Sequence, residues 1–596
     1  MDYDACPSLP AMFFAQAARR GAGPFLWEKR DGVYRPISWA ETAGAVRNLA
    51  GGLAALGVVP GDRVALVAEN RPEWAVADLA IMASGAITVP GYVTNTVENH
   101  HHLLADSGAK VAIVSTAALS TRLIPAVNQV SSVRTVIALE APGQPCRVPV
   151  RSWDEVVRLG SAGAETRVAA AIGPDDIACM IYTSGTGGTP KGVLLSHRNV
   201  LANCRGAYRL LEMLGLGDEV FLSFLPLSHS YEHTAGLMFP ISIAAQIYFA
   251  EGAETLSANL IEARPTIMTA VPRLYEVMHQ RIRRGIERDS GLKRRLFEKT
   301  VAIGRKRLAS RPLGLGARLL DPVLDRLVRD KVRARFGGRL KAMVSGGAPL
   351  NPEIGSFFLA LGVELLQGYG QTEAAPVISC NRPGRARPDT VGLPLDGVRV
   401  RIADDGEILV TGDNVMKGYW NDPAATARAL DDGWLHTGDV GVIDANGQLR
   451  ITDRLRDFIK NSGGDMIAPA RVEGCLTLQP EIGQAVVFGD NRPYLVAVLV
   501  PDAEFAASFA RQHRVADPPA ALAGDPGFAK AIGDAVARAN LSLSPIERVR
   551  RFLVAAEPFT IANAQLTPTL KPRRHAIRRA YAAALDELYQ GKGLAA

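Results

Sequence analysis

The sequence predicts an α/β protein of two domains, in which a large N-terminal domain ends in a β-rich part. Three observations lead to this prediction. The chain has 596 residues, which is too long for one ordinary hydrophobic core. Before Gly392 strand-like and helix-like segments alternate, which is typical of parallel and mixed sheets with helices packed on them. After Gly392 paired strand patterns around turn residues replace that alternation.

The first alternating segments lie between Asp62 and Val114. They are predicted, in order, as a strand, a helix and two strands over residues 63–68, 74–84, 87–89 and 110–114. Similar apolar runs, each followed by a loop with Gly, Ser or His, recur at 178–182, 220–225, 266–270 and 340–344. Ligands bind beyond the carboxyl ends of strands in open parallel sheets, so these loops are expected to form the site. Asn351 and Pro352 are typical of a helix start and predict a helix over residues 352–361.

Two hairpin patterns predict a β-rich subdomain over about residues 392–452. Residues 398–410 alternate around Asp405-Gly406, and residues 440–452 alternate around Asn446-Gly447. A third hairpin pattern, over residues 484–500, is followed by helical segments to the end of the chain. We therefore expect a hinge at Asp453-Arg454, between an N-terminal domain of residues 1–453 and an α+β C-terminal domain of residues 454–596.

Composition narrows the class of protein. Apolar residues make up 47% of the chain and charged residues 21%, which is normal for a globular protein. The six cysteines are scattered without a Cys-x-x-Cys pair, so neither a disulfide framework nor a zinc site is expected. The N-terminus opens with acidic residues, and the longest apolar stretch, residues 236–250, is too short to span a bilayer. These features predict a cytoplasmic protein.

Positive charge is concentrated in one segment. Residues 273–341 contain 21 Lys and Arg against 7 Asp and Glu, a net charge of +14, whereas the whole chain carries +7 and the remainder therefore −7. Two interpretations stay open: solvated helix faces, or attraction to an anionic membrane surface or a phosphate-rich ligand. Nucleic acid is not expected, because no binding motif or interleaved aromatic residues accompany the charge. The oligomeric state is left open.

The most informative segment runs from Tyr182 to Val193 and reads Tyr-Thr-Ser-Gly-Thr-Gly-Gly-Thr-Pro-Lys-Gly-Val. Its hydroxyls donate hydrogen bonds, its glycines let backbone N–H groups approach an anion, and Lys191 adds a positive charge. That combination suits a phosphate. The common P-loop is excluded, because Pro190 precedes the lysine and Gly192 follows it. Composition alone would also suit a flexible surface connection.

The order Thr-Ser-Gly-Thr-x-Gly-x-Pro-Lys-Gly resembles the signature of the adenylate-forming superfamily, with Gly187 where a second Thr is more common. Six further segments resemble the superfamily in the same order along the chain: residues 345–349, 368–373, 433–439, 453–457, 462–464 and 568–571. The resemblance therefore covers essentially the whole chain. It implies a small C-terminal domain that moves during the reaction, and it implies ATP, Mg²⁺ and coenzyme A as cofactor and co-substrates.

The resemblance also implies a two-step reaction. A substrate carboxylate attacks the α-phosphate of ATP to give an acyl-adenylate and pyrophosphate, and the thiol of coenzyme A then displaces AMP. Catalysis of the first step is mostly positioning and charge stabilisation, because negative charge is spread over phosphoryl oxygens. Residues 225–233, 271–276, 467–469 and the basic insert resemble the bacterial long-chain fatty acyl-CoA synthetase branch, so a fatty acid is the expected substrate.

Roles are carried over residue by residue from the matching motifs. The implied catalytic residues are Lys571, Glu373, Thr372 and His229. The implied nucleotide-binding residues are Thr183, Ser184, Gly185, Thr186, Gly188, Lys191, Gly347, Ala348, Pro349, Gln367, Gly368, Tyr369, Gly370, Asp439 and Arg454. Mg²⁺ is assigned to Thr186 and Glu373, the hinge to Asp453, and the coenzyme A tunnel to Gly463 and Gly464.

Each key residue also has a plainer interpretation. Glu373 suits an exposed ion pair, Lys571 a solvated tail, Tyr369 a core aromatic residue and His229 a structural histidine. These alternatives stay open from the sequence.

Small residues such as Ala235 and Gly236 are expected to leave room for an apolar acyl chain. Two rival functions stay open. One is a fatty acyl-AMP ligase that passes the acyl group to a carrier protein, and the other is a non-catalytic acyl or nucleotide sensor. The joint presence of Lys571, Glu373 and Asp439 argues against the sensor.

Overall fold

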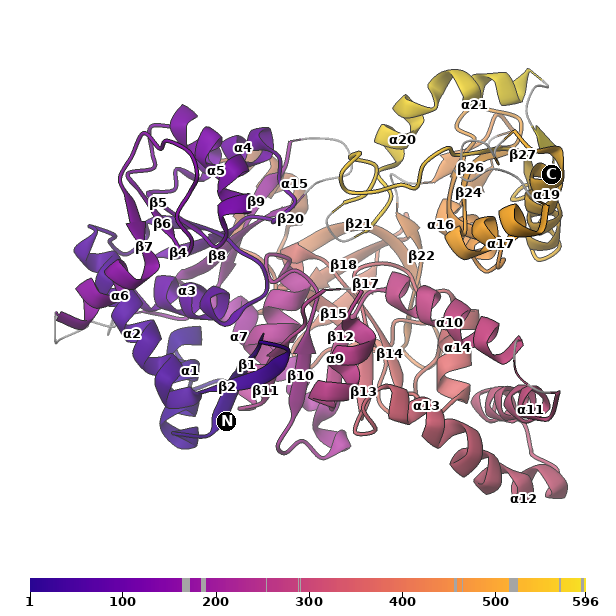
Figure 1. Cartoon of the computed structure of the whole chain (residues 1–596), viewed down its shortest axis with the longest axis horizontal. Coiled ribbons are helices and arrows are strands. Elements are labelled where there is room, and N and C mark those ends of the chain that lie inside the picture. The colour runs from indigo at the N-terminus through magenta and orange to yellow at the C-terminus, as the bar shows by residue number, and fades with distance from the viewer. Residues whose placement is uncertain are drawn as a thin grey trace.

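The computed structural model describes the chain except for a set of short segments and single residues: 163–171, 184–188, 253, 288, 290, 455–457, 464, 514–521, 523, 568–569, 591–593 and 596. It confirms the predicted α/β class. Two large sheets and a small β-rich sheet build the N-terminal part, and a separate α+β part follows at the C-terminus, coloured orange to yellow in Figure 1.

An eight-stranded sheet contains the phosphate-loop segment at one end. In spatial order its strands are β19 (Gly418–Tyr419), β9 (Lys191–Ser196), β8 (Ile177–Thr183), β4 (Ile87–Pro90), β3 (Arg63–Val67), β5 (Val111–Val114), β6 (Thr135–Ala138) and β7 (Val150–Ser152). Strands β8 to β7 run parallel, and β9 and β19 are antiparallel to their neighbours. The associated helices are α2 (Trp39–Ala55), α3 (Pro72–Ala83), α4 (Val97–Ser107), α5 (Ala117–Gln129) and α6 (Trp153–Ala162).

A nine-stranded sheet carries most of the other site loops. Its spatial order is β16 (Leu393–Pro394), β15 (Val377–Cys380), β14 (Leu365–Gly370), β13 (Ala342–Ser345), β12 (Ile267–Ala270), β10 (Val220–Ser223), β11 (Gln246–Phe249), β1 (Pro24–Arg30) and β2 (Val33–Ser38). Strands β14 to β1 are parallel, so their carboxyl ends share one edge. The predicted strands at 220, 266 and 340 are confirmed, each within two residues at both ends.

Further helices of the N-terminal part pack on its sheets. They are α1 (Leu9–Arg20), α7 (His197–Leu211), η1 (Glu212–Leu214), η2 (Glu232–Met238), α8 (Phe239–Ser242), α9 (Leu256–Ala263), α14 (Pro352–Ala360), η4 (Thr372–Ala374) and α15 (Pro423–Ala429). Helix α14 begins as predicted, because the Asn351 side chain accepts a hydrogen bond from the Glu353 N–H. Helix α3 is buried along almost its whole length, and its one buried carboxylate, Asp78, lies 2.8 Å from Nε2 of the buried His233.

The basic segment is helical. It forms α10 (Pro272–Glu287), α11 (Gly291–Leu308), α12 (Leu315–Leu324), η3 (Asp325–Arg329) and α13 (Asp330–Arg335). In Figure 1 the helices α11 and α12 project at the lower right, at the edge of the molecule.

Both predicted hairpins form the β-rich sheet, whose strands are β17 (Arg399–Ile402), β18 (Glu407–Thr411), β20 (Leu430–Asp431), β21 (Trp434–Ile443) and β22 (Leu449–Arg454). Strands β17 and β18 pair around Asp405-Gly406, and β21 and β22 pair around Asn446-Gly447. Strand β22 ends at the predicted hinge.

The described residues of the C-terminal part form a two-stranded sheet, a four-stranded sheet and two hydrophobic clusters. The first sheet contains β23 (Ile459–Lys460) and β24 (Met466–Ile467), and the second contains β25 (Ile482–Phe488), β26 (Leu495–Pro501), β27 (Val549–Val554) and β28 (Leu594–Ala595). The helices of this part are α16 (Pro469–Thr477), α17 (Ala503–His513), α19 (Pro526–Asn540), α20 (Arg574–Ala580) and α21 (Ala582–Tyr589). The third predicted hairpin is confirmed as the antiparallel pair β25–β26.

Arginine 284 of α10 connects the two parts. Its guanidinium forms ion pairs with Asp502 and, at 2.7 Å, with Glu504, and it donates at 3.2 Å to the carbonyl of Pro480. The Asn351 amide also donates to the carbonyl of Gly474 at 3.0 Å. All six cysteines are free, as predicted. In the part of the chain that the structure describes, no helix has the length and apolar character needed to cross a membrane.

Candidate active site

The predicted phosphate loop is the connection of a β-hairpin. Strands β8 and β9 pair so that Thr183 lies opposite Lys191 at the open end. The predicted residues Ser184, Gly185, Thr186 and Gly188 lie outside the described residues. Lys191 Nζ is 3.6 Å from an Asp422 carboxylate oxygen and 4.9 Å from the centre of the Tyr419 ring. Its ammonium group is thus placed at the end of the hairpin where the loop begins.

Tyr419 connects this lysine to Glu373. The Tyr419 hydroxyl donates to Glu373 Oε1 at 2.8 Å, and β19 brings the tyrosine there by pairing with β9. Glu373 is half-buried in η4, so it is not the exposed ion-pair residue of the plainer interpretation. Sequence reasoning missed Tyr419. The only local signal is the short Gly418-Tyr419-Trp420 run, whose partner strand lies far away in sequence.

Thr372 and Gln367 lie on either side of the Gly368–Gly370 segment. Thr372 is buried, and its hydroxyl is 2.9 Å from the hydroxyl of Ser230. The side-chain oxygen of Gln367 is buried and has no hydrogen-bond partner among the described residues. Gly370 must be glycine, since a Cβ there would lie 1.9 Å from the Pro376 carbonyl oxygen. The segment is therefore held tightly and keeps an acceptor available for a ligand.

His229 lies in the N-terminal part, and the charge of Lys571 from the C-terminal part acts on it. The ammonium group of Lys571 is close enough to His229 to help lower the pKa of the imidazole to about 3, an effect caused chiefly by burial of the ring. Nδ1 of His229 accepts the Tyr231 N–H at 3.2 Å. The neutral ring therefore carries its proton on Nε2, which can donate a hydrogen bond but cannot serve as a cation near pH 7.

A small closed turn holds Lys571. The Thr567 N–H donates to the Lys571 carbonyl at 2.8 Å, and the Lys571 N–H donates to the Thr567 hydroxyl at 3.0 Å. Leu566 and Pro572 form a β-bridge across the base of the turn, and Leu570 adopts a left-handed conformation with φ 62°. The interpretation of Lys571 as a residue of a solvated tail is therefore wrong. The backbone of Lys571 is folded into this turn, and its charge acts on His229.

The predicted adenosine residues also meet. The Tyr369 hydroxyl donates to Asp439 Oδ2 at 2.7 Å, and Asp439 is only 3% exposed. Arg454 lies directly opposite Asp439 in the β21–β22 register. The side chains of Asp453 and Arg454 lie outside the described part. Tyr369 is half-buried and packs against the hydrophobic core of the N-terminal part.

Glu407 holds the loop before Asp439, and sequence reasoning missed it. Its two carboxylate oxygens accept from the Gly438 N–H at 2.8 Å and lie 2.7 Å from His436 Nδ1. The Thr437 hydroxyl donates to the Ile408 carbonyl at 2.7 Å. These bonds tie the loop to β18.

The loop after β13 contains Gly347, Ala348 and Pro349. A Cβ at Gly346 would meet the Tyr231 ring at 2.8 Å, so a glycine lets this loop lie directly on the tyrosine. Tyr231 in turn donates to the Val344 carbonyl at 2.9 Å. Gly347 has φ 82°, a conformation that favours glycine.

The space beside Gly236 is filled by Glu232. A Cβ at Gly236 would lie 2.4 Å from the Glu232 carboxyl group, so the prediction that this glycine leaves room for an acyl chain is wrong. Glu232 is fully buried and accepts from the hydroxyls of Ser223 and Thr269, each at 2.7 Å. Burial raises its pKa to about 7, against which these hydrogen bonds act. Ala235 is half-buried in the same π-helical turn, η2.

The predicted coenzyme A residues lie elsewhere. Gly463 is exposed in the turn between β23 and β24, and Gly464 lies outside the described residues. Among the residues that the structure describes, no group of three or more His, Cys, Asp or Glu side chains is arranged to hold a metal. Glu373 offers a carboxylate near Lys191, which suits Mg²⁺, an ion that commonly binds one or two carboxylates together with substrate phosphates.

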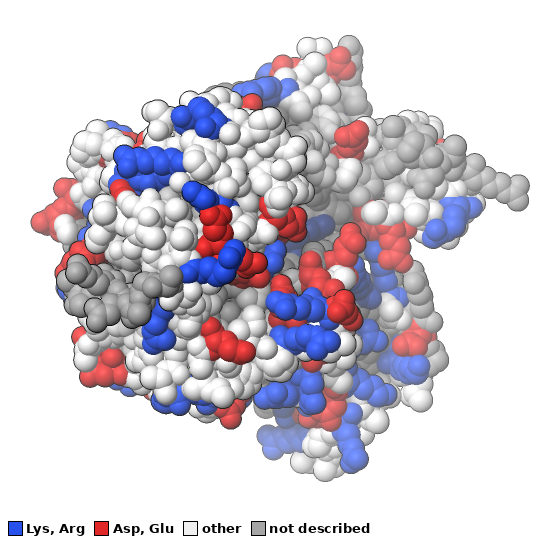
Figure 2. Space-filling view, turned by 60° about the vertical axis from the view of Figure 1, so that its left-hand side comes forward, with Lys and Arg blue, Asp and Glu red and all other residues white. Residues whose placement is uncertain are grey.

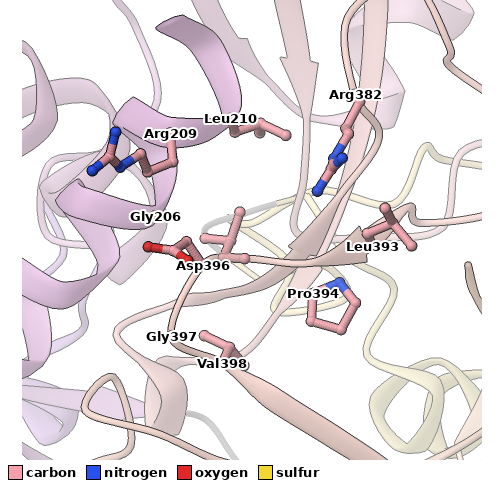
Figure 3. A pocket seen from close by; sticks show the side chains of 10 residues that line it. Gly206, Arg209, Leu210, Arg382, Leu393, Pro394, Asp396, Gly397 and Val398 are labelled. Carbon is pink, nitrogen blue, oxygen red and sulfur yellow. The ribbon is translucent and has the colours of Figure 1, made fainter. Parts of the chain in front are cut away.

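A surface cavity of about 410 Å³ lies outside this site. It is lined by the end of α7 and by residues 393–398, together with Arg382. Figure 3 shows Arg382 pointing into the space and Arg209 pointing away from it. None of the predicted site residues lines this cavity.

Known protein families match this chain along most of its length. The profile of the family described as AMP-binding enzyme matches residues 13–420, and that of the AMP-binding enzyme C-terminal domain matches residues 456–593. The chain is 36% identical to long-chain-fatty-acid--CoA ligase FadD15 of Mycobacterium tuberculosis, over 94% of this chain and 93% of that protein. It is 31% identical to human long-chain-fatty-acid--CoA ligase 1, over 95% and 84% of the two chains.

Solved structures show the fold. The adenylation domain of a carboxylic acid reductase from Segniliparus rugosus, in complex with AMP and a co-purified carboxylic acid, superposes with a TM-score of 0.78 at 23% identity. That match covers 98% of this chain and 94% of the other. The o-succinylbenzoate coenzyme A synthetase of Bacillus subtilis, in complex with AMP, superposes with a TM-score of 0.67 at 22% identity, covering 96% and 97%.

Proposed function

The chain belongs to the AMP-binding enzyme family, and from this premise we propose that it is an AMP-forming long-chain fatty acid–CoA ligase. Its similarity to long-chain-fatty-acid--CoA ligases extends over more than nine tenths of the chain. The observation that carries the proposal is the meeting of residues from separate motifs in one site, as in the 2.7 Å hydrogen bond from Tyr369 to Asp439, with the charge of Lys571 acting on His229 from the C-terminal part.

In the first step the residues position a carboxylate against the α-phosphate of ATP. Lys191 and the β8–β9 hairpin hold the β- and γ-phosphates, and Thr372 donates to the α-phosphate. Glu373 holds Mg²⁺, which when bound neutralises charge on the phosphate oxygens. Neutral His229 donates from Nε2 to the fatty acid carboxylate, and Lys571 stabilises the negative charge that develops between the two reactants.

The nucleoside lies at the other end of the site. Tyr369 stacks on the adenine, whose other face meets the backbone at Gly347 and Ala348. Asp439 accepts hydrogen bonds from the ribose hydroxyls, and Arg454, its register partner, supports the ribose. A carboxylate accepts several hydrogen bonds, so the bond from Tyr369 leaves Asp439 able to do this.

The second step needs a different placement of the C-terminal domain. Residues 454–596 rotate about Asp453, which removes Lys571 from the site. The turn with Gly463 and Gly464 then lines the path of the coenzyme A thiol, where a side chain would obstruct it. The thiolate attacks the acyl carbonyl, AMP leaves, and a thioester forms.

Two variants test this assignment by half-reaction. Lys571→Ala should slow adenylate formation, measured by pyrophosphate exchange, by roughly 10²- to 10³-fold, and should spare thioester formation from supplied acyl-adenylate. Gly463→Leu should spare adenylate formation and abolish thioester release. If both variants lose the same half-reaction, the two-conformation mechanism is wrong.

The final acceptor is tested separately. Free coenzyme A should give a thioester in high yield, whereas transfer only to a holo-carrier protein would show a fatty acyl-AMP ligase. Absence of pyrophosphate release with fatty acids of any chain length would show a non-catalytic sensor.

We also propose that the protein works in the cytoplasm and meets an anionic membrane surface through the basic segment 273–341, with its net charge of +14. Attraction of this kind weakens when salt screens the charges. Vesicle binding that is unchanged by about 0.5 M salt would contradict a purely electrostatic attachment.

A further inference from the structure

Helix α12 and the π-helical turn η3 carry an exposed apolar stripe. Leu315, Leu319, Val323 and Leu327 follow one another at four-residue spacing and are 80%, 79%, 48% and 45% exposed. Single exposed leucines are common and need no explanation, but four on one side of one helix form a continuous patch. We call these four residues the α12 stripe.

The opposite side of the same helix is anchored to the protein. Leu324 is fully buried, and Asp321 is 2% exposed. Arg329, also buried, pairs with Asp321 at 2.9 Å and donates to the Ala360 carbonyl of α14 at 3.0 Å. The helix is thus fixed by its inner side, and the α12 stripe is its stable outer surface.

Much of the basic charge around α12 is already neutralised. Arg333 pairs with Asp325 and Asp330, and Arg307 pairs with Asp321. The acidic residues of α12, η3 and α13 are therefore occupied by ion pairs within the protein.

Two exposed arginines lie beside the stripe. Arg318 is three residues after Leu315, and Arg326 is three residues after Val323, so both share its side of the helix. Figure 2 shows Lys and Arg gathered at the lower right of that view, among fewer Asp and Glu. An apolar stripe with flanking arginines is the pattern of a helix that lies in the interface of an anionic bilayer.

We propose that the α12 stripe inserts into the surface of an anionic lipid bilayer, with Arg318 and Arg326 on the headgroups. This inference rests on the proposed function in one respect, since a long-chain fatty acid partitions into bilayers and would be collected there. A second copy of this chain is a poorer occupant. Two stripes facing each other would bring together two segments that each carry +14, and a 15-residue helix is too short to bury a typical stable interface.

The test uses the full chain and the double variant Leu315→Ser/Leu319→Ser. Both leucines are largely exposed, so their replacement should not disturb folding. The matched control is Leu541→Ser, which changes an 83% exposed leucine of the C-terminal part. Binding is measured by flotation with phosphatidylcholine vesicles that contain about one third phosphatidylglycerol, and with phosphatidylcholine alone.

Wild-type protein and the Leu541→Ser control should float with the anionic vesicles. The double variant should bind these vesicles at least roughly tenfold more weakly than wild type. Arg318→Gln/Arg326→Gln should weaken binding to anionic vesicles and leave the weak binding to phosphatidylcholine unchanged. Equal binding of wild type and the double leucine variant would overturn the proposal, as would failure of wild type to bind either vesicle. A wild-type dimer that the double variant abolishes would assign the stripe to a second copy instead.

A short, water-dissolved fatty acid separates this inference from the proposed function. With such a substrate, wild type and the double variant should release AMP at the same rate, whereas with a long-chain acid delivered in vesicles the variant should be slower. No AMP from wild type with any acid would contradict the proposed function, and the vesicle result would still decide the docking.

Discussion

Glutamate 232 should make the stability of this protein depend on pH in a direction opposite to that of most carboxylates. It is fully buried in η2 between Ser223 and Thr269, and burial raises its pKa from 4.5 to about 7. The folded state therefore prefers the neutral acid, while the unfolded chain ionises near pH 4.5. Its contribution to stability is fully present below pH 4.5 and is lost as the pH rises towards about 7.

The size of the effect follows from the two pKa values. A pKa unit corresponds to 1.36 kcal/mol, so ionisation of Glu232 in the folded protein is less favourable by about 3 kcal/mol than in the unfolded chain. That amount should disappear from the free energy of unfolding between about pH 4.5 and pH 7, and little more should be lost above it. Glu232→Gln cannot ionise, so its free energy of unfolding should not show this loss; its side chain keeps one acceptor oxygen and replaces the other with an NH2 donor.

The assay is urea unfolding followed by tryptophan fluorescence, between about pH 5 and pH 8, for wild type and Glu232→Gln. The quantity of interest is the difference between the two free energies at each pH, because the titration of other groups cancels in it. This difference should shift in favour of the variant by about 2 to 3 kcal/mol across the range. Thr269→Val offers a second check, since it removes a hydrogen bond that lowers the pKa of Glu232 and should move the loss towards higher pH.

Parallel curves for wild type and Glu232→Gln would refute the reasoning. They would mean that the carboxyl group ionises in the folded protein as it does in the unfolded chain, so that burial beside Gly236 does not isolate it from water.

Two further predictions concern the site and its closure. Tyr419→Phe removes the hydroxyl that donates to Glu373 at 2.8 Å, so it should lower kcat/KM for pyrophosphate release about tenfold and raise the Mg²⁺ concentration needed for activity. The control is Tyr34→Phe, which removes a hydroxyl that donates to the Phe249 carbonyl. An unchanged Mg²⁺ titration of Tyr419→Phe would show that Tyr419 does not act on the metal site. Arg284→Ala removes the ion pairs to Asp502 and Glu504 that join the two parts, and should shift the domain equilibrium by about 1 to 2 kcal/mol, slowing adenylate formation roughly tenfold while sparing thioester formation. The exposed neighbour in Arg283→Ala should change neither half-reaction, and equal losses in both half-reactions for Arg284→Ala would show general destabilisation instead.

Much of the fold was predictable because its signals are local. Asn351-Pro352 marks the start of α14, and Asp405-Gly406 and Asn446-Gly447 mark two turns, since each signal depends only on neighbouring residues. Helix α4 was not predicted. Its sequence contains three consecutive histidines and shows little contrast between its faces.

The site was predictable where a motif fixes a residue and not where tertiary contacts do. Tyr369 and Asp439 were identified from separate motifs and meet at 2.7 Å. Tyr419 and Glu407 were missed, because the first acts through a strand pairing distant in sequence and the second through hydrogen bonds to a loop. Gly236 was misinterpreted for a related reason: sequence shows that a side chain is absent but not which neighbour occupies the space.

The turn that carries Lys571 limits how this residue can move. A β-bridge joins Leu566 to Pro572 at its base. Two hydrogen bonds join Thr567 to Lys571 beside that bridge. These contacts tie the backbone of Lys571 to its neighbours in the C-terminal part, so we expect its ammonium group to move together with that part. Lys571 should then enter and leave the site on the microsecond-to-millisecond timescale of domain motions, not on the nanosecond timescale of loop motions. The attack of the coenzyme A thiol on the acyl-adenylate would then be limited by this slower domain motion in every catalytic cycle.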